Sequence, residues 1–282
     1  MKDLLTNVDS AIVKNLSERP EALNDAEYVK AAVRQTTNTS GGGAGDARSR
    51  TPINIAFTPA MNYALNLGLL SEYFETELYS RGLNVAGLIP NELRQVFVRI
   101  LLNEVEQREI LLTLLGSNAI IKPNFDFTAG RRLFNVFSQF GTFAALAQAS
   151  EDLGERAYKG QAGNVMADDF ALVTALRFHS VEARHASELR RIRGEKGWKT
   201  LNSRGTLPAF TQPIYDGEEN VVQGGVNVVT LTGFPATTVS EAFDEPISGP
   251  TALSIVSLFV RGQFDFPPAP SGFSEGEKSM DT

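Results

Sequence analysis

The stretch FHSVEARHASELRRIRG, residues 178–194, determines how the rest of the chain is interpreted. Its apolar residues recur at steps of three and four, which predicts an amphipathic helix that Gly194 ends. On the side of this helix that should face a core, the sequence places Glu182 and, three residues later, His185. Residues three apart on a helix lie one above the other, so both side chains can reach one point. A carboxylate and an imidazole placed in this way indicate a pair of metal ligands.

Three other segments show the same helical pattern, and each is followed by a glycine that can end a helix. The four predicted helices run from about Thr58 to Arg81, from Pro90 to Gly116, from about Thr128 to Lys159 and from about Met166 to Arg193. Gly130 and Gly141 are possible interruptions of the third. Four long helices with short connections predict an all-α fold, an antiparallel four-helix bundle.

Each predicted core-facing stripe carries a glutamate near its middle, and these are Glu72, Glu104, Glu151 and Glu182. A carboxylate without a partner is costly in an apolar interior, so four of them in one bundle need a common explanation. Helix bundles hold two iron or manganese ions with one Glu from each of two helices and a Glu-x-x-His pair from each of the other two. The pattern therefore favours a site for two metal ions.

The alternative is that these glutamates lie at the surface or pair with arginines, and Arg99, Arg108, Arg177 and Arg184 are available as partners. A lone glutamate on an apolar stripe is usually explained in this way. Four glutamates with matching neighbours favour the metal site instead.

A second spacing divides the four helices into two similar halves. The first two predicted helices form one half, and the last two form the other. Tyr79 follows Glu72 by seven residues, and Tyr158 follows Glu151 by the same interval. Seven residues are nearly two helical turns, so each tyrosine lies on the face of its glutamate. We take Tyr79 and Tyr158 as candidate catalytic residues that orient ligands or supply an electron; the alternative is that they are core tyrosines with a bonded hydroxyl.

The second helix departs from the expected ligand pattern, because Gln107 follows Glu104 at the position where a histidine would complete the pair. A glutamine offers a neutral amide oxygen, a weaker ligand than imidazole. The predicted metal ligands are therefore Glu72, Glu104, Gln107, Glu151, Glu182 and His185, with two ions if the site is intact and one or none if Gln107 disables it. His179 is a possible replacement ligand, or else a packed or outer-shell histidine.

Several phrases resemble a family of ferritin-like proteins associated with desiccation and stress. They are NYALNLGLLSEYFETELY (62–79), ASEDLGERAYKG (149–160), FHSVEARHASELRRIRG (178–194), KPNFDF (122–127) and AFDEPIS (242–248). The resemblance covers about residues 55–260. It implies a ferritin-like bundle with a C-terminal extension, and it places Glu72, Glu104, Glu151, Glu182 and His185 at ligand positions. The Gln107 position departs from the family's histidine.

Composition narrows the chemistry. The 282 residues include no cysteine and only two histidines, and the net charge is −7. Disulfides, thiolate zinc sites, iron–sulfur clusters and a cysteine nucleophile are excluded. A carboxylate-rich site favours iron, manganese, calcium or magnesium. The lack of a long basic cluster argues against a nucleic-acid partner.

The flanking regions have a different character from the bundle. We divide the chain into an N-terminal helical arm and Gly/Ser-rich linker (1–54), the bundle (55–195) and a C-terminal extension and tail (196–282) of loops, a short strand at 226–232, a helix at 249–260 and a loose tail from 263. The start of the chain has no apolar signal segment, and no stretch is a transmembrane helix, so we expect a cytoplasmic protein, although members of the resembled family are often exported.

Two functions are favoured at this stage, and a hydrolase that uses paired carboxylates is a minor third, because the sequence has no Ser-His-Asp phrase and no Gly-x-Ser-x-Gly turn. The first is a di-iron or di-manganese oxidoreductase that reacts with dioxygen or peroxide in stress protection. The second is a structural protein that uses the bundle as a scaffold and assembles, as a homo-oligomer, through the N-terminal arm and the C-terminal extension. The Gln107 departure favours the second, and the four stripe glutamates favour the first.

Overall fold

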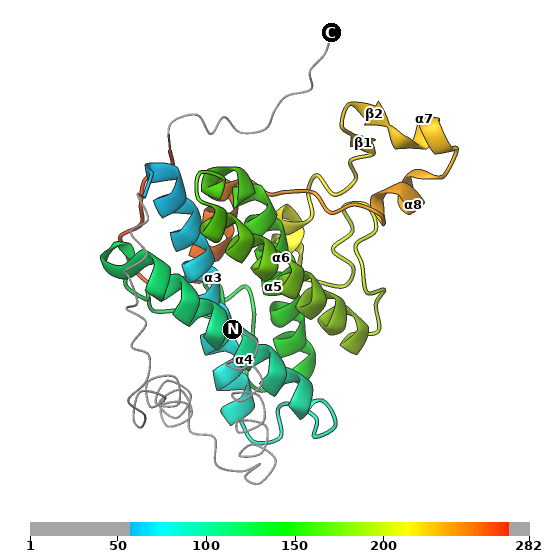
Figure 1. Ribbon diagram of the computed structural model, residues 1–282. Helices are drawn as coiled ribbons and strands as arrows, with labels where there is room; N and C mark the ends of the chain where they lie inside the picture. The colour runs from blue at the N-terminus through cyan, green and yellow to red at the C-terminus, as the bar shows by residue number, and fades with distance from the viewer. Residues whose placement is uncertain (1–56, 271–282) are drawn as a thin grey trace, which may run out of the picture.

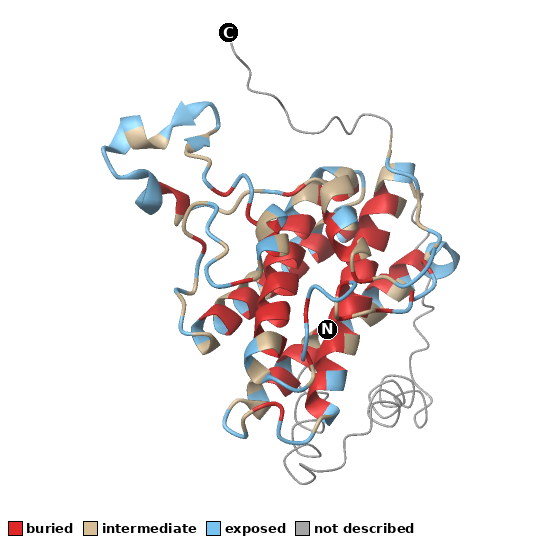
Figure 2. Ribbon diagram, turned by 180° about the vertical axis from the view of Figure 1, so that it is seen from behind, coloured by how far each residue is buried: buried red, intermediate tan, exposed pale blue. Residues whose placement is uncertain are grey.

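The computed structural model describes residues 57–270, and the helices predicted within residues 1–36 and the linker at 36–52 lie outside this range. Four long helices form the body of the molecule (Figure 1): α3 (Pro59–Asn84), α4 (Arg94–Leu115), α5 (Phe140–Val165) and α6 (Asp169–Ile192). α3 packs on α4, α5 packs on α6, and α3 also packs on α5. The predicted all-α bundle is confirmed. Buried residues concentrate where these helices face one another (Figure 2).

The helix bounds correct several predictions, and packing explains why. α3 continues through Gly82 to Asn84. Gly82 does not end the helix but allows close packing, because a Cβ at this position would lie 2.3 Å from the Phe143 ring. α4 begins at Arg94 and not at Pro90, since residues 91–93 form a turn.

The third helix differs most from its prediction of 128–159. Residues 128–139 are not helical, because Ala129, Arg131 and Asn135 have φ values of 47°, 70° and 62°, which a right-handed helix cannot contain. At its other end α5 runs through Gly160 to Val165. Gly160 does not end the helix but makes room for another part of the chain, because a Cβ there would lie 2.0 Å from the carbonyl oxygen of Ile247.

The first helical element of the C-terminal extension is the 3-10 helix η3 (Ala209–Ile214). A shorter 3-10 helix, η2 (Gly116–Asn118), follows α4 in the bundle. A small hairpin pairs β1 (Val222–Gln223) with β2 (Val226–Asn227), and the short helices α7 (Val228–Thr232) and α8 (Ala236–Ser240) follow it. The strand predicted at 226–232 is therefore wrong beyond Asn227, where the side chain of that residue caps a helix.

The predicted helix at 249–260 is present as α9 (Gly249–Ser257), and it packs on α3 and α5. The tail predicted to be loose from 263 is partly fixed, because the Phe266 ring packs edge-to-face on Tyr63 with 5.4 Å between centroids. Among the described residues, no helix is both long and apolar enough to cross a membrane.

Buried charges attach this extension to α5, a feature that the sequence did not reveal. The guanidinium of Arg156 contacts Glu218 at 2.8 Å and donates to backbone carbonyls of Ile214, Asp216, Glu245 and Pro246. Lys199 forms ion pairs with Glu155 and Asp244. Both cations are almost fully buried, so removal of either one would leave an uncompensated buried charge. The extension is therefore held on the bundle next to the middle of α5.

The contact at Gly160 gives a first prediction. Gly160→Ala should lower the free energy of unfolding by about 1–3 kcal/mol, since the added methyl group overlaps the Ile247 backbone. Gly163→Ala, in the same helix and with open space at its Cβ, should instead raise it by up to about 1 kcal/mol. Urea denaturation of both variants measures the difference, and equal effects would contradict the proposed contact.

Candidate metal centre

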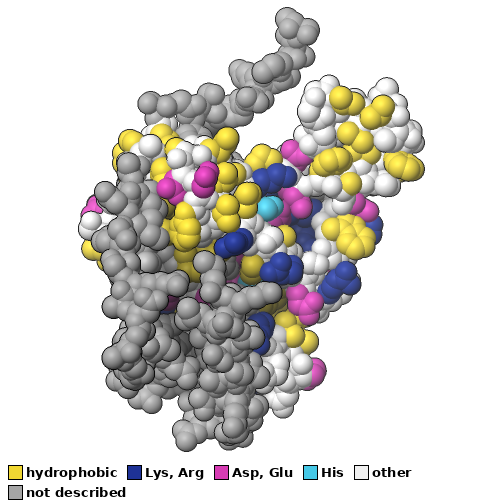
Figure 3. Space-filling model, in the orientation of Figure 1, with side chains coloured by type: hydrophobic (Ala, Val, Ile, Leu, Met, Phe, Trp, Pro, Cys, Tyr) yellow, Lys and Arg dark blue, Asp and Glu magenta, His cyan; other side chains and the backbone are white. Residues whose placement is uncertain are grey.

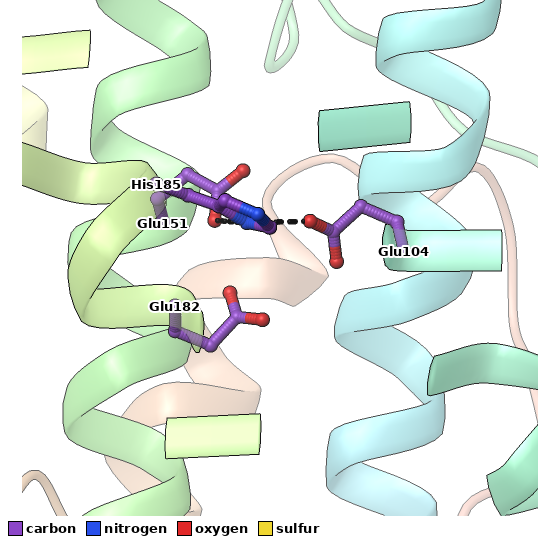
Figure 4. Close-up of side chains that lie close together, drawn as sticks. All are labelled: Glu104, Glu151, Glu182 and His185. Atoms are coloured by element: carbon purple, nitrogen blue, oxygen red, sulfur yellow. Dashed lines mark hydrogen bonds and ion pairs between the residues drawn. The ribbon is translucent and has the colours of Figure 1, made fainter. Parts of the chain in front are cut away.

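The predicted ligands meet at the centre of the bundle. Glu72 comes from α3, Glu104 from α4, Glu151 from α5, and Glu182 and His185 from α6. The four glutamates have no exposed surface, and His185 is 7% exposed. Figure 4 shows the His185 ring between the carboxylates of Glu151 and Glu104, with Glu182 one turn away on the same helix.

The distances define two overlapping groups of ligand atoms. His185 Nδ1 lies 2.7 Å from Glu104 Oε1 and 3.2 Å from Glu151 Oε2. One ligand atom each from Glu104, Glu151, Glu182 and His185 lie within 4.8 Å of one another. Atoms of Glu72, Glu75 and Glu104 form a second group within the same limit. Glu104 belongs to both groups, so its carboxylate could help to hold an ion in either one.

Four glutamate oxygens of these groups are buried without a hydrogen-bond partner, and they are Glu72 Oε2, both oxygens of Glu75 and Glu182 Oε2. Among residues 57–270, no lysine or arginine forms an ion pair with any of these glutamates, and Arg108 pairs with Glu109 instead. The arginine-paired alternative therefore does not describe them. Buried carboxylates need a compensating charge, and one or two divalent cations fit this donor set.

A comparison with known families agrees with this geometry. The model of the ferritin-like domain matches residues 58–195. Residues 58–195 form a ferritin-like domain. No curated protein matches the chain significantly. The matched segment begins one residue before α3, ends three residues after α6, and contains every candidate ligand.

Burial makes four glutamates of the centre reluctant to ionise without a cation, as the raised pKa values of Glu72, Glu75, Glu104 and Glu182 show. It raises the pKa of Glu72 to about 7, although hydrogen bonds from Glu104 and Tyr158 oppose this rise. Burial, together with repulsion by neighbouring carboxylates, raises the pKa of Glu75, Glu104 and Glu182 well above the ordinary value. A bound cation would reverse this balance, since it favours the charged form.

The raised pKa values predict how the metal-free protein responds to pH. Above pH 4.5 the unfolded state loses the proton of Glu72, whereas the folded state keeps it up to about pH 7. The contribution of this proton to the stability of the folded state is therefore full below pH 4.5 and is lost as pH rises through about 7. At about 1.4 kcal/mol per pKa unit, Glu72 alone contributes on the order of 3 kcal/mol.

Chelator-treated protein should therefore have a lower free energy of unfolding at pH 8 than at pH 5.5 in urea denaturation. Glu72→Gln should make the unfolding free energy depend less steeply on pH. The metal-free protein would contradict this account if its stability rose with pH across the same range.

The two tyrosines pair across the halves of the bundle and not within them. The Tyr79 hydroxyl donates to Glu151, and the Tyr158 hydroxyl donates to Glu72 at 2.5 Å. Burial raises the pKa of both phenols well above the ordinary value, so both keep their protons. Each half thus orients a carboxylate of the other half. The sequence predicted the face on which each tyrosine lies but not this exchange of partners.

Gln107 lies in the centre as predicted, with an unexpected role. Its amide nitrogen donates to Glu182 at 2.9 Å and to Glu104 at 3.2 Å, so it holds two carboxylates in place. His179 belongs to neither ligand group, because Nδ1 of its half-buried ring contacts the backbone oxygen of Glu155 at 2.9 Å. It is therefore not a replacement for the missing imidazole.

Glu75 is the member of the centre that our ligand prediction omitted. It is fully buried on α3, one turn after Glu72, and its oxygens belong to the second ligand group. The signal was present in the sequence, because Glu75 lies on the same core-facing stripe as Glu72. The prediction allowed one glutamate for this helix and so overlooked the second.

Proposed function

We propose that this ferritin-like protein binds two iron or manganese ions and uses them to reduce dioxygen or peroxide. The observation that carries the proposal is the set of buried, unpartnered glutamate oxygens beside His185. Their burial without a cation opposes folding at neutral pH, so a positive charge at this place is the arrangement that best explains them.

The donor set supports the choice of metal. Oxygen ligands with a single imidazole suit iron and manganese, whereas tetrahedral sulfur and nitrogen sets are typical of structural zinc. When bound, a pair of iron or manganese ions supplies two electrons, which is enough to reduce peroxide to water or to begin the reduction of dioxygen. Consumption of ferrous iron and peroxide is protective, so we extend the proposal to a role in oxidative stress.

The space next to the ligands favours a small reactant. A cavity between α3, α5 and α9 is lined by Gly154 and Tyr158, and it has room for no more than about one water molecule. Gly154 lies against Glu182, and the Tyr158 hydroxyl contacts Glu72. An organic substrate does not fit such a space.

The chain's own residues have separate tasks in this proposal. Glu72, Glu104, Glu151, Glu182 and His185 hold the ions, and Gln107 keeps Glu104 and Glu182 in position. Tyr79 and Tyr158 keep their hydroxyl protons and donate hydrogen bonds that orient Glu151 and Glu72. The apolar side chains around the centre exclude bulk water, which strengthens the attraction between carboxylates and ions.

The direct test compares Glu182→Gln with Glu188→Gln, a matched change on the exposed side of the same helix. Wild-type protein loaded with Fe(II) should bind about two ions per chain and oxidise them when peroxide is added. Glu182→Gln should lose both properties, and Glu188→Gln should keep them. Wild-type protein that binds no iron or manganese after dialysis would refute the proposal.

A second candidate function, self-assembly, is favoured by the hairpin arm, which we define as residues 221–240. This arm contains no charged residue, and it projects from the bundle with apolar side chains uncovered (Figure 3, upper right). Leu231 is 72% exposed and Phe234 is 58% exposed. An exposed apolar surface of this kind indicates an interaction site.

A second copy of the chain is the partner that we infer for the arm. Each copy carries another uncovered apolar stripe, formed by Met166, Phe170 and Val173 at the start of α6. Both surfaces are uncovered by the other residues of 57–270, so contact between copies would bury them together. The N-terminal arm, which we also expected to take part, lies outside the described residues.

Analytical ultracentrifugation tests this assembly. The wild type should form oligomers at micromolar concentration, and a Leu231→Ser/Phe234→Ser variant should sediment as a monomer with unchanged helix content. Thr230→Ser, which removes little apolar surface from the same arm, should behave as the wild type. A monomeric wild type, or an unchanged oligomer in the double variant, would contradict self-assembly through the arm.

A further inference from the structure

The two ligand groups of the centre do not have the same chemistry. One contains His185 with three glutamates, and the other, Glu72 with Glu75 and Glu104, contains carboxylates alone. The difference arises at two positions. Gln107 stands where an imidazole would serve the second group, and Glu75 adds a carboxylate to α3 that the metal-site pattern does not require.

Gln107 adds no charged donor to the second group, because its side-chain amide is neutral. Its amide nitrogen points at Glu104 and Glu182 and donates a hydrogen bond to each. Its oxygen has no hydrogen-bond partner. Without Glu75, the second group would have only Glu72 and the shared Glu104 as charged donors, which is too few for a firmly held divalent cation.

Glu75 is the third carboxylate of this group. Glu75 has no exposed surface, and neither of its carboxylate oxygens has a hydrogen-bond partner among the described residues. It follows Glu72 by three residues on α3, so both carboxylates lie on one face of the helix, one turn apart. Glu75 also extends towards α5, because its Oε1 lies 3.6 Å from the place that a Cβ on Gly154 would occupy.

We propose that Glu75 replaces the absent imidazole as the third protein ligand of an all-carboxylate site, formed with Glu72 and Glu104, for a hard divalent cation such as Mn²⁺. This inference rests on the proposed two-ion function. Oxygen-only donor sets suit manganese, magnesium and calcium, whereas imidazole suits iron, zinc and copper. The two positions therefore differ in metal preference, with the His185 group better suited to iron and the Glu75 group to manganese.

The test measures bound manganese per chain and dissociation constants by titration calorimetry, with no activity assay. Wild-type full-length protein should bind about two Mn²⁺ ions, and Glu75→Gln should bind one. Loss of an outer-shell partner alone weakens metal binding about 10–100-fold, so removal of this ligand should weaken the second ion by more than about 100-fold. Glu77→Gln is the matched control, since Glu77 lies on the same helix and pairs with Lys122 at the surface.

A second variant tests the replacement itself. In the Glu75→Gln background, Gln107→His should restore binding of the second ion, because it supplies the imidazole for which Glu75 substitutes. Far-ultraviolet circular dichroism verifies that each variant is folded. The Gln substitution removes a buried carboxylate without a change of shape, so folding should be preserved or improved.

The outcomes separate this inference from the proposed function. A wild type that binds no manganese or iron overturns both. A wild type with two ions, together with an unchanged Glu75→Gln variant, leaves the proposed function standing and overturns the role of Glu75. A Glu75→Gln variant that loses one ion and is not restored by Gln107→His overturns the claim that Glu75 substitutes for an imidazole.

Discussion

The burial of five glutamates between four helices is the constraint on which the rest of the structure depends. Glu72, Glu75, Glu104, Glu151 and Glu182 are fully enclosed, and none of them has a lysine or arginine partner among the described residues. Water is not available to solvate these carboxylates, so the bundle must either keep protons on them or bind cations. Much of the neighbouring structure is arranged around this requirement: the tyrosines of each half contact glutamates of the other half, Gln107 donates to two of them, and Gly154 leaves room for Glu182.

Sequence reasoning was sufficient where one helix determined the result. The stripe spacing predicts that Glu182 and His185 share a helix face. It also predicts that the four stripe glutamates all point into the core of the bundle. It failed where two segments meet. Gly82 and Gly160 resemble helix ends in the sequence, but each is an internal glycine that admits a distant residue, Phe143 or Ile247. Contacts between distant segments leave no local pattern to read.

The same limit explains the other omissions. Arg156 and Lys199 are ordinary cations in the sequence, and only the fold shows that they are buried and attach the C-terminal extension to α5. Glu75 lies on the same stripe as Glu72, but the expected pattern needs only one glutamate on that helix, so the spacing alone does not select it. The extension therefore supports the centre through α5, since this helix carries Glu151 and Gly154 as well as Glu155 and Arg156, which form the buried ion pairs.

Crystals soaked with Mn²⁺ and measured at the manganese absorption edge test the central claim most directly. The account predicts two anomalous peaks inside the bundle, about 3.5–4 Å apart as in other two-metal sites. One should lie among Glu104, Glu151, Glu182 and His185, and the other among Glu72, Glu75 and Glu104. A well-ordered bundle without a peak between these carboxylates would show that they stay protonated, and it would contradict the view that they are buried in order to hold metal ions.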